Sequence, residues 1–240
     1  MRKDVFGIMV ENNCITINFP NGAGGHKLGR LIATCDNVLW YDYKGNGTAP
    51  WILYGENDHN FTKFHFNRRF AGATGKGVCE KTIIPVGSKS KLSLDFQREI
   101  IQDWKMQLFP NNFIYTLHEP VDVMRNIFGK HKEVFIIPDI KFLFERFMQT
   151  SYHYFIDPAN KEYTLGDKLE HDAKKIHSFL EAKIKNLEDN VKENTFVVYD
   201  VKDMLDENNF LKLCEHLDLD FNLDSYNAVK SAIVDTSGNM

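Results

Sequence analysis

The sequence has no long hydrophobic run. No stretch of its 240 residues approaches the roughly 18 consecutive apolar residues of a membrane-spanning helix. The apolar residues near the start, from Val5 to Val10, are followed at once by Glu11-Asn-Asn, which ends the run too early for a signal peptide. We therefore expect no membrane association and a cytoplasmic location.

The sequence also has no strong excess of charge of either sign. Lys and Arg number 29 and Asp and Glu number 33, which gives a formal net charge of −4. Binding to nucleic acid or to an anionic membrane usually needs a broad cationic field. We expect neither partner, and any anion site must come from a local arrangement of residues.

Cysteines are few and are not spaced as metal ligands. Cys14, Cys35, Cys79 and Cys214 form no CxxC pair and have no spacing to histidine that would make a zinc site. Zinc sites require such spacing, so we expect no metal site. We expect the four thiols to be reduced and to serve mostly in packing.

The remaining composition is that of a globular protein with a sizeable core. Hydrophobic residues make up 43% and charged residues 26% of the chain, close to the usual values. The length fits one domain, 1–240, although two are possible. Residues 43–93 carry much Gly, Asn, Lys and Thr with little periodicity, so we treat them as an irregular excursion from that domain.

Strands and helices alternate along the rest of the sequence. Apolar, β-branched runs predict strands at 14–19, 38–41, 113–117, 133–137 and 195–199. Helical periodicity follows at about 28–35, 93–108, 121–128, 140–154, 165–190, 209–217 and 225–234. This pattern predicts a three-layer α/β fold, with a mainly parallel sheet flanked by helices. The segments at 113–137 form a βαβ unit, which predicts that its two strands pair directly.

Two of these helices carry a row of apolar residues, and we expect the row of the longer helix, at 165–190, to be buried. In the helix at 93–108, Phe96 belongs to an apolar side with Ile100, Ile101, Trp104 and Leu108. In the helix at 165–190, the apolar stripe includes Phe179 and runs on to Val191. Such stripes are more often part of a core than a surface for a partner.

The segment Pro20-Asn-Gly-Ala-Gly-Gly-His-Lys-Leu28 joins the first strand to the first helix. Glycines allow close approach of a ligand, and the unpaired N–H groups at a helix start attract anions. His26 and Lys27 can add positive charge. The alternative is a structural turn without ligand, but three glycines opening a helix favour the phosphate site. Because Leu28 follows Lys27, the segment lacks the Ser/Thr of a nucleoside triphosphatase loop.

Other polar residues also follow predicted strands, at the edge where parallel sheets bind ligands. His118, within Thr116-Leu-His-Glu-Pro120, can serve as a general base or can simply hydrogen-bond to a neighbour. Asp139 and Asp200 follow two further strands and are more often helix caps than metal ligands.

We predict that Gly24 and Gly25 start the helix that contains Leu28. At least one of the two glycines should have a positive φ or a close neighbour, and both should share a crevice with His118.

Several segments in order resemble the sulfotransferases that use 3′-phosphoadenosine 5′-phosphosulfate (PAPS). These segments are Phe19-Pro20 to Leu28, Phe113-Ile-Tyr-Thr-Leu-His118-Glu-Pro120, Val134-Phe-Ile-Ile-Pro-Asp139, Ser151-Tyr-His-Tyr-Phe155, Phe196-Val-Val-Tyr-Asp200 and Phe210-Leu-Lys-Leu-Cys-Glu-His-Leu217. The resemblance covers most of the chain outside 43–93. It implies a P-loop-like α/β fold with PAPS, or its product PAP, as the nucleotide.

The resemblance also implies roles for individual residues. The amides from Gly22 to His26, including those of Gly24 and Gly25, would hold the 5′-phosphosulfate together with Lys27. Ser151 matches the family's Ser at the 3′-phosphate, and His118 would deprotonate a small-molecule acceptor. Arg146, on the helix that follows Pro138, is not a family position but is a candidate to restore positive charge at the nucleotide. Asn21 stands where the family has its catalytic Lys, and Pro138 stands where it has an Arg.

Three hypotheses for function follow. The first is transfer of a sulfuryl group from PAPS to a hydroxyl or amine. The second is a nucleotide or nucleoside kinase, with Lys27 at the phosphates and Asp139 or Asp200 holding Mg²⁺. The third, motivated by Asn21 and Pro138, is a non-catalytic relative that binds a small anion or a protein partner.

Overall fold

The computed structural model describes residues 13–20, 22–38, 92–108, 110–117, 120–150 and 165–237. Most of the excursion at 43–93 therefore lies outside the described residues. The same holds for residues 39–41 of the second predicted strand and for the end of the helix predicted at 140–154.

Four strands form one sheet in which every neighbouring pair is parallel. The strands are β1 (Cys14–Asn18), β2 (Phe113–Leu117), β3 (Lys132–Ile136) and β4 (Thr195–Val198), in the order β2-β1-β3-β4. All five residues of β1 are buried, as expected for a central parallel strand covered on both faces. Each of the four matches a strand predicted from the sequence to within one residue at either end.

The predicted direct pairing of β2 with β3 is wrong, because β1 lies between them. Thr16 of β1 is in register with Tyr115 on one side and with Glu133 on the other. The connecting helix α5 (Val121–Phe128) therefore crosses over β1. A βαβ pattern in a sequence indicates a parallel crossover but does not show how many strands it passes. Val38 also bridges in parallel to Asn112, just before β2.

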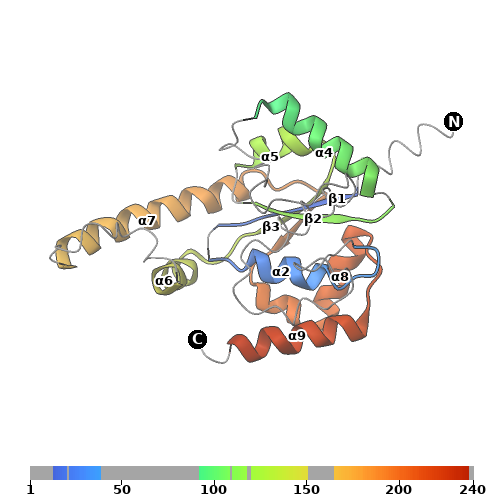
Figure 1. Ribbon diagram of the computed structural model, residues 1–240. Coiled ribbons are helices and arrows are strands. Elements are labelled where there is room, and N and C mark those ends of the chain that lie inside the picture. The colour runs from blue at the N-terminus through green and yellow to red at the C-terminus, as the bar shows by residue number, and fades with distance from the viewer. Residues whose placement is uncertain are drawn as a thin grey trace, which may run out of the picture.

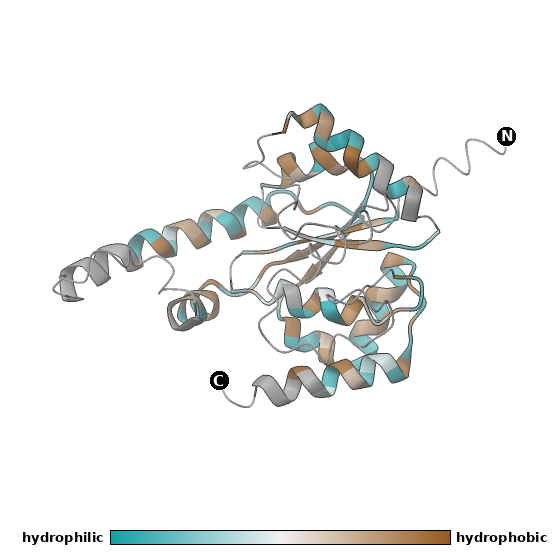
Figure 2. Cartoon of the chain, viewed as in Figure 1, coloured by the Kyte–Doolittle hydropathy of each residue, from teal (hydrophilic) through white to brown (hydrophobic). Residues whose placement is uncertain are grey.

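Helices cover both faces of the sheet, which confirms the α/β architecture. Helices α4 (Leu94–Leu108) and α5 lie on one face, and α2 (Gly25–Ile32), α8 (Glu207–Leu217) and α9 (Leu223–Ser237) lie on the other (Figure 1). Helix α6 (Ile140–Thr150) follows β3, and the short 3₁₀ helix η3 (Val201–Leu205) follows β4. Helix α7 (Leu165–Glu188) extends away from the sheet, and hydrophobic residues alternate with hydrophilic ones along it (Figures 1 and 2).

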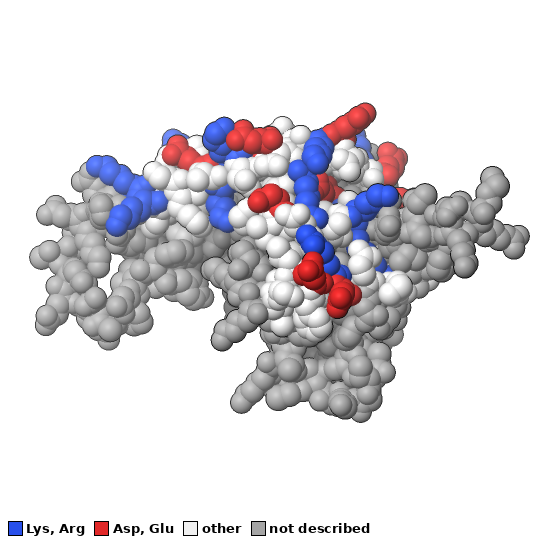
Figure 3. All heavy atoms as spheres, turned by 90° about the horizontal axis from the view of Figure 1, so that it is seen from above, with Lys and Arg blue, Asp and Glu red and all other residues white. Residues whose placement is uncertain are grey.

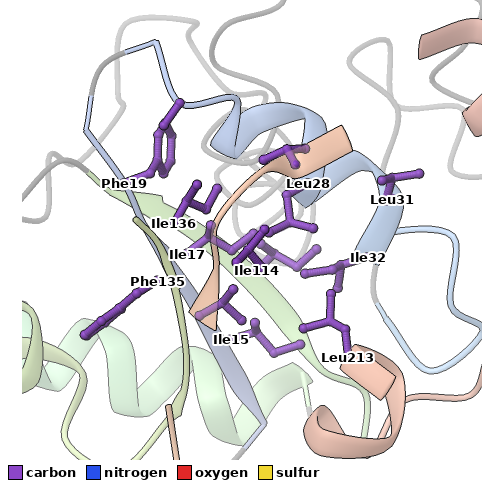
Figure 4. Packing of buried hydrophobic residues seen from close by; sticks show 14 of the residues in the cluster. Ile15, Ile17, Phe19, Leu28, Leu31, Ile32, Ile114, Phe135, Ile136 and Leu213 are labelled. Carbon is purple, nitrogen blue, oxygen red and sulfur yellow. The ribbon is translucent and has the colours of Figure 1, made fainter. Parts of the chain in front are cut away.

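The core between the sheet and α2 fixes the position of that helix. Ile15 and Ile17 of β1 lie close to Leu28 and Ile32 of α2 and to Leu213 of α8, and all five are fully buried (Figure 4). Full burial of an aliphatic side chain stabilises a fold by about 1.5–3 kcal/mol. Packing of α2 on β1 therefore holds the start of the helix just beyond the carboxyl end of the strand.

Two residues expected in the core, Phe179 and Val191, are instead exposed, and so is Phe96 on the apolar side of α4. Phe96 is 47%, Phe179 45% and Val191 43% exposed. Phe179 lies on the outer side of α7, where the Lys183 ammonium is 5.8 Å from its ring centroid. Val191 follows the end of α7, and Phe96 is in the first turn of α4. In α7, the buried part of the apolar stripe consists of Ile176, Leu180, Ile184 and Leu187. The stripe predicted from apolar periodicity was wider than this buried part.

Within the described residues, no helix is long and apolar enough to cross a membrane. On the described part of the face seen from above, Lys and Arg are mixed with Asp and Glu (Figure 3). The described cysteines, Cys14, Cys35 and Cys214, are free thiols and are buried, whereas Cys79 lies outside the described residues.

Candidate anion site at the glycine loop

The candidate site begins where β1 ends. The chain leaves the strand at Asn18, turns through a hydrogen bond from the Ala23 N–H to the Pro20 carbonyl (3.1 Å), and enters α2 at Gly25. Gly22 and Gly24 have φ values of +88° and +82°. Residues with a side chain rarely adopt this conformation, so the turn requires glycine at both positions.

Gly25 is required for a different reason. A Cβ atom at this position would lie 2.1 Å from the ring of Phe19, which is itself buried. The first turn of α2 therefore rests directly on the aromatic ring that ends the strand. The structure confirms that Gly24 and Gly25 start the helix, Gly24 with a positive φ as its N-cap and Gly25 with a close neighbour.

The glycine loop lies between two other elements that follow strands. A Cβ at Gly22 would meet Leu143 of α6 at 3.5 Å, and one at Gly24 would meet Val201 of η3 at 3.4 Å. The segments after β1, β3 and β4 thus gather at one edge of the sheet. Sequence reasoning missed Leu143 and Val201, although each is an apolar residue in the first turn of a helix that follows a strand.

The loop presents backbone N–H groups that the described part of the chain does not use. Among the described residues, the N–H groups of Gly22, Gly24 and Gly25 donate no hydrogen bond, whereas those of Lys27 and Leu28 donate to the Gly24 carbonyl at 2.9 and 3.2 Å. Unpaired amides at the positive end of a helix dipole favour an anion such as phosphate or sulfate. The arrangement can therefore bind one anionic group by its backbone.

Two predicted cationic residues lie on the helices beside this loop. Lys27 is in the first turn of α2 and is partly exposed. Arg146 belongs to α6 and precedes Phe147, whose backbone N lies 3.9 Å from the Cβ position of Gly22. The backbone of His26 is in α2, but its side chain is outside what the structure describes, as is Ser151.

His118 lies just outside the described residues, so its place in a shared crevice stays a prediction. The residue before it, Leu117, ends β2 and is in register with Asn18, which ends β1. The two strands thus end at the same edge of the sheet. This register agrees with the argument that led us to connect the glycine loop with His118.

The two aspartates that follow strands act as helix caps. Asp139 Oδ1 accepts a hydrogen bond from the Phe142 N–H at 3.0 Å, and Asp200 Oδ1 accepts one from the Lys202 N–H at 2.8 Å. Both carboxylates thus satisfy N–H groups in the first turn of α6 or η3. In the described part of the chain, no group of three or more His, Cys, Asp or Glu side chains could hold a metal ion.

The order of the strands also marks this edge as a place for a ligand. From β1 the chain proceeds to β2 on one side, and it then crosses back to β3 on the other side. The connections α2 and α5 accordingly lie on opposite faces (Figure 1). In doubly wound sheets, ligands bind beyond the carboxyl ends of the strands at such a reversal. Here the reversal lies between β1 and β3, next to the glycine loop.

A buried charged cluster, which the sequence did not reveal, lies at the opposite edge. Arg125 of α5 donates to both carboxylate oxygens of Glu133 at 2.7 and 2.8 Å, Thr195 Oγ1 donates to Oε2 at 3.3 Å, and His131 Nε2 lies 3.2 Å from Oε1. Burial alone would raise the pKa of Glu133, but the hydrogen bonds from His131 and Arg125 outweigh it and lower the pKa to about 2. The sequence signal that could have revealed this cluster is Glu133, a charged residue within an otherwise apolar strand.

Known proteins offer no match to this chain: no protein-family model fits it, and neither a curated protein nor a solved structure is significantly similar to it.

Proposed function

We propose that this protein is a sulfotransferase-like enzyme that moves a sulfuryl group from PAPS to a hydroxyl or amine acceptor. The observation that carries the proposal is the glycine loop, in which Gly22 and Gly24 have positive φ values and open α2 at the carboxyl end of β1. The resemblance of the sequence to sulfotransferases supplies the chemical class. The all-parallel sheet is compatible with the α/β fold that this resemblance implies.

The loop fits the phosphosulfate end of the nucleotide. The N–H groups of Gly22, Gly24 and Gly25, which no described residue accepts from, can donate to its oxygens, and Lys27 is in the first turn of the same helix. A side chain at Gly22 or Gly24 would be strained by the positive φ and would press on Leu143 or Val201, so it would disturb the loop. PAPS, when bound, would supply the sulfuryl group that is transferred.

The residues proposed to bind the 3′-phosphate of the nucleotide match the family less directly. Pro138, where the family has an Arg, is buried and has neither an N–H group nor a charge. We propose that Arg146 of α6 takes over the 3′-phosphate, because α6 lies against the glycine loop through Leu143 and Phe147. Ser151, directly after this helix in the sequence, is the second proposed contact.

Sulfuryl transfer resembles phosphoryl transfer in that positioning and charge stabilisation matter most. In our proposal the loop amides hold the negative charge of the donor in place. His118 removes the proton from the acceptor hydroxyl or amine. Replacing His118 by Ala should abolish turnover and leave nucleotide binding nearly unchanged, whereas unchanged turnover would exclude His118 as the base.

The kinase hypothesis has less support. It needs Asp139 or Asp200 to hold Mg²⁺, yet both carboxylates already accept hydrogen bonds from helix N–H groups. It also needs a hydroxyl after Lys27, where the chain has Leu28, which is fully buried.

Ligand-dependent stability separates the three hypotheses. Thermal unfolding is measured with adenosine 3′,5′-bisphosphate and, separately, with ATP plus Mg²⁺, because a ligand at 100 times its Kd stabilises the native state by about 2.7 kcal/mol. We expect stabilisation by the bisphosphate. Stabilisation by ATP alone would favour the kinase, and no effect of either would favour the non-catalytic relative.

Variants then locate the binding site. We expect Lys27→Ala to weaken binding of the bisphosphate about tenfold or more, as loss of a charge-assisted hydrogen bond usually does. Lys212→Ala, on the exposed side of α8 away from the loop, is the matched control and should bind as the parent chain does. Equal affinities of the two variants would contradict the assignment of the loop.

A further inference from the structure

Two cysteines from distant parts of the sequence lie in contact in the core. Cys35 Sγ and Cys214 Sγ are 3.6 Å apart, and each residue is only 2% exposed. Cys35 is in the turn after α2, and Cys214 is on α8, 179 residues later. Among the cysteines that the structure describes, this is the pair in contact, whereas Cys14 is on β1.

The separation of the sulfurs is close to what a covalent bond needs. A disulfide has an S–S length of about 2.05 Å, so the two sulfurs must approach by roughly 1.5 Å. Cys35 lies outside the regular part of α2, in a turn closed by hydrogen bonds from Thr34 and Cys35 to the carbonyls of Leu31 and Ile32. A turn can shift by such a distance more easily than a residue within a packed helix.

We propose that Cys35 and Cys214 form a reversible intramolecular disulfide under oxidising conditions, which cross-links the end of α2 to α8. This modification goes beyond the proposed function and does not depend on it. With oxidised glutathione, one cysteine attacks the glutathione disulfide and releases one glutathione thiol. The second cysteine then attacks the mixed disulfide and releases the other. Two electrons pass from the cysteine pair to glutathione, and two protons end on its thiols.

The surroundings make this a slow reaction. The hydrogen bond with Cys214 raises the pKa of the Cys35 thiol most, followed by burial and by the negative charges of Asp36 and Asp220. Because the thiolate is the attacking species, the folded pair reacts only when the turn opens. The oxidation rate should therefore increase with pH, and the bond should resist reduction once the core has closed around it.

The cross-link would act on the helix that carries the candidate anion site. Helix α2 begins at the glycine loop and ends shortly before Cys35, so the bond would fix its far end to α8. A disulfide restricts the unfolded chain, more so when it closes a long loop. From that effect we expect oxidation to raise the Tm by about 5–10 °C.

The test uses the full chain with Cys79→Ser, which removes the cysteine outside the described residues. The reduced protein is equilibrated with glutathione buffers of increasing oxidised fraction and quenched in acid. Free thiols are then alkylated, and a non-reducing digest is analysed by mass spectrometry. We expect one linked peptide pair that contains Cys35 and Cys214, that disappears on reduction, and that accompanies the rise in Tm.

Two further measurements keep the test independent of how single variants fold. Cys14→Ser in the same background should still form the linked pair, whereas Cys35→Ser should show neither linkage nor the rise in Tm. Failure to find the linked peptide in fully oxidised buffer would overturn the proposal. A linkage between Cys14 and either partner, or a lower Tm on oxidation, would also overturn it.

Discussion

The two edges of the sheet differ in how they use their polar groups. At the amino edge, the carboxylate of Glu133 on β3 binds Arg125, Thr195 and His131, and Arg125 also donates to the Asn190 carbonyl at 2.9 Å. At the carboxyl edge, the glycine loop leaves N–H groups without a partner among the described residues. The amino edge joins charged side chains to one another, whereas the carboxyl edge has backbone donors that no described residue uses.

Two lysines extend the internal network at the amino edge. Lys105 of α4 is fully buried and donates to the carbonyls of Phe128 and Lys130. Lys132, which begins β3, donates to Asn112 Oδ1 at 3.2 Å and to the Leu217 carbonyl. These bonds connect helices of both faces to the strand starts. The amino edge therefore holds a buried network of charged side chains, while the carboxyl edge is shaped by backbone conformation.

The largest effect is expected from Glu133→Gln. The substitution keeps the size of the side chain but removes the charge that Arg125 and His131 face, and breaking a buried pair typically costs 3–5 kcal/mol. We expect the free energy of unfolding to fall by about 3 kcal/mol, as measured by urea denaturation, without loss of anion binding at the other edge.

Asp189→Asn is the matched control for this variant. Its partner Lys185 lies on the exposed side of α7, where both side chains are more than half exposed. Surface ion pairs contribute little, so this variant should unfold as the parent chain does. Equal stability of Glu133→Gln and Asp189→Asn would remove the distinction between the edges.

The same carboxylate predicts how stability depends on pH. The pKa of Glu133 is lowered from 4.5 to about 2 in the folded chain. Its contribution is therefore complete above pH 4.5 and is lost as the pH falls to about 2. The stability difference between the parent chain and Glu133→Gln should shrink from about 3 kcal/mol at pH 7 to near zero at pH 2. A constant difference would exclude Glu133 as its source.

Local patterns in the sequence predicted much of the fold. The apolar runs that became β1, β2, β3 and β4 are short and bounded by polar or glycine residues, so their limits are visible in one sequence. Which strands are neighbours is decided by packing between distant segments. This is why β2 and β3 were wrongly paired, and why Phe179 was expected to be buried although it is 45% exposed.

For the candidate site, too, the features set by local sequence were predicted, whereas the contacts between distant segments were not. The need for glycine at positions 24 and 25 follows from a strand that runs directly into a helix, and it was predicted correctly. The helix-cap role of Asp139 and Asp200 follows from local sequence and was also confirmed. The walls formed by Leu143 and Val201, and the pairing of Arg125 with Glu133, join segments that only the fold brings together.

A substitution of Gly25 probes the carboxyl edge directly. In Gly25→Val, the new Cβ would overlap the buried ring of Phe19, which must move. Overpacking of this kind costs about 1–3 kcal/mol, so we expect a loss of about 2 kcal/mol in the free energy of unfolding, together with loss of anion binding. Urea denaturation and binding of adenosine 3′,5′-bisphosphate are the two measurements.

Gly129 at the end of α5 offers a matched control away from the loop. It also has a positive φ, of +60°, but a Cβ there would meet only the end of the Gln102 side chain at 3.8 Å. Gly129→Ala should therefore lower the free energy of unfolding by about 1–3 kcal/mol through backbone strain alone and leave anion binding unchanged. If Gly129→Ala weakened binding as much as Gly25→Val, the effect could not be assigned to the loop.

The smallest effect on stability is expected at Asp200, where two substitutions distinguish a helix cap from a metal ligand. Its carboxylate accepts a hydrogen bond from the Lys202 N–H at the start of η3, and an amide oxygen can accept the same bond. Removing a cap with Ala costs about 1 kcal/mol, whereas Asn replaces Asp at little cost. We expect Asp200→Ala to lower the free energy of unfolding by this amount and Asp200→Asn to match the parent chain.

A Mg²⁺ ligand would behave differently, because loss of the charge in Asp200→Asn would weaken binding of ATP with Mg²⁺ while stability without ligand stayed the same. Parallel urea denaturation and ATP titrations of the two variants therefore test whether the acidic residues of the carboxyl edge serve the fold, as the hydrogen bond indicates, or the chemistry of a kinase.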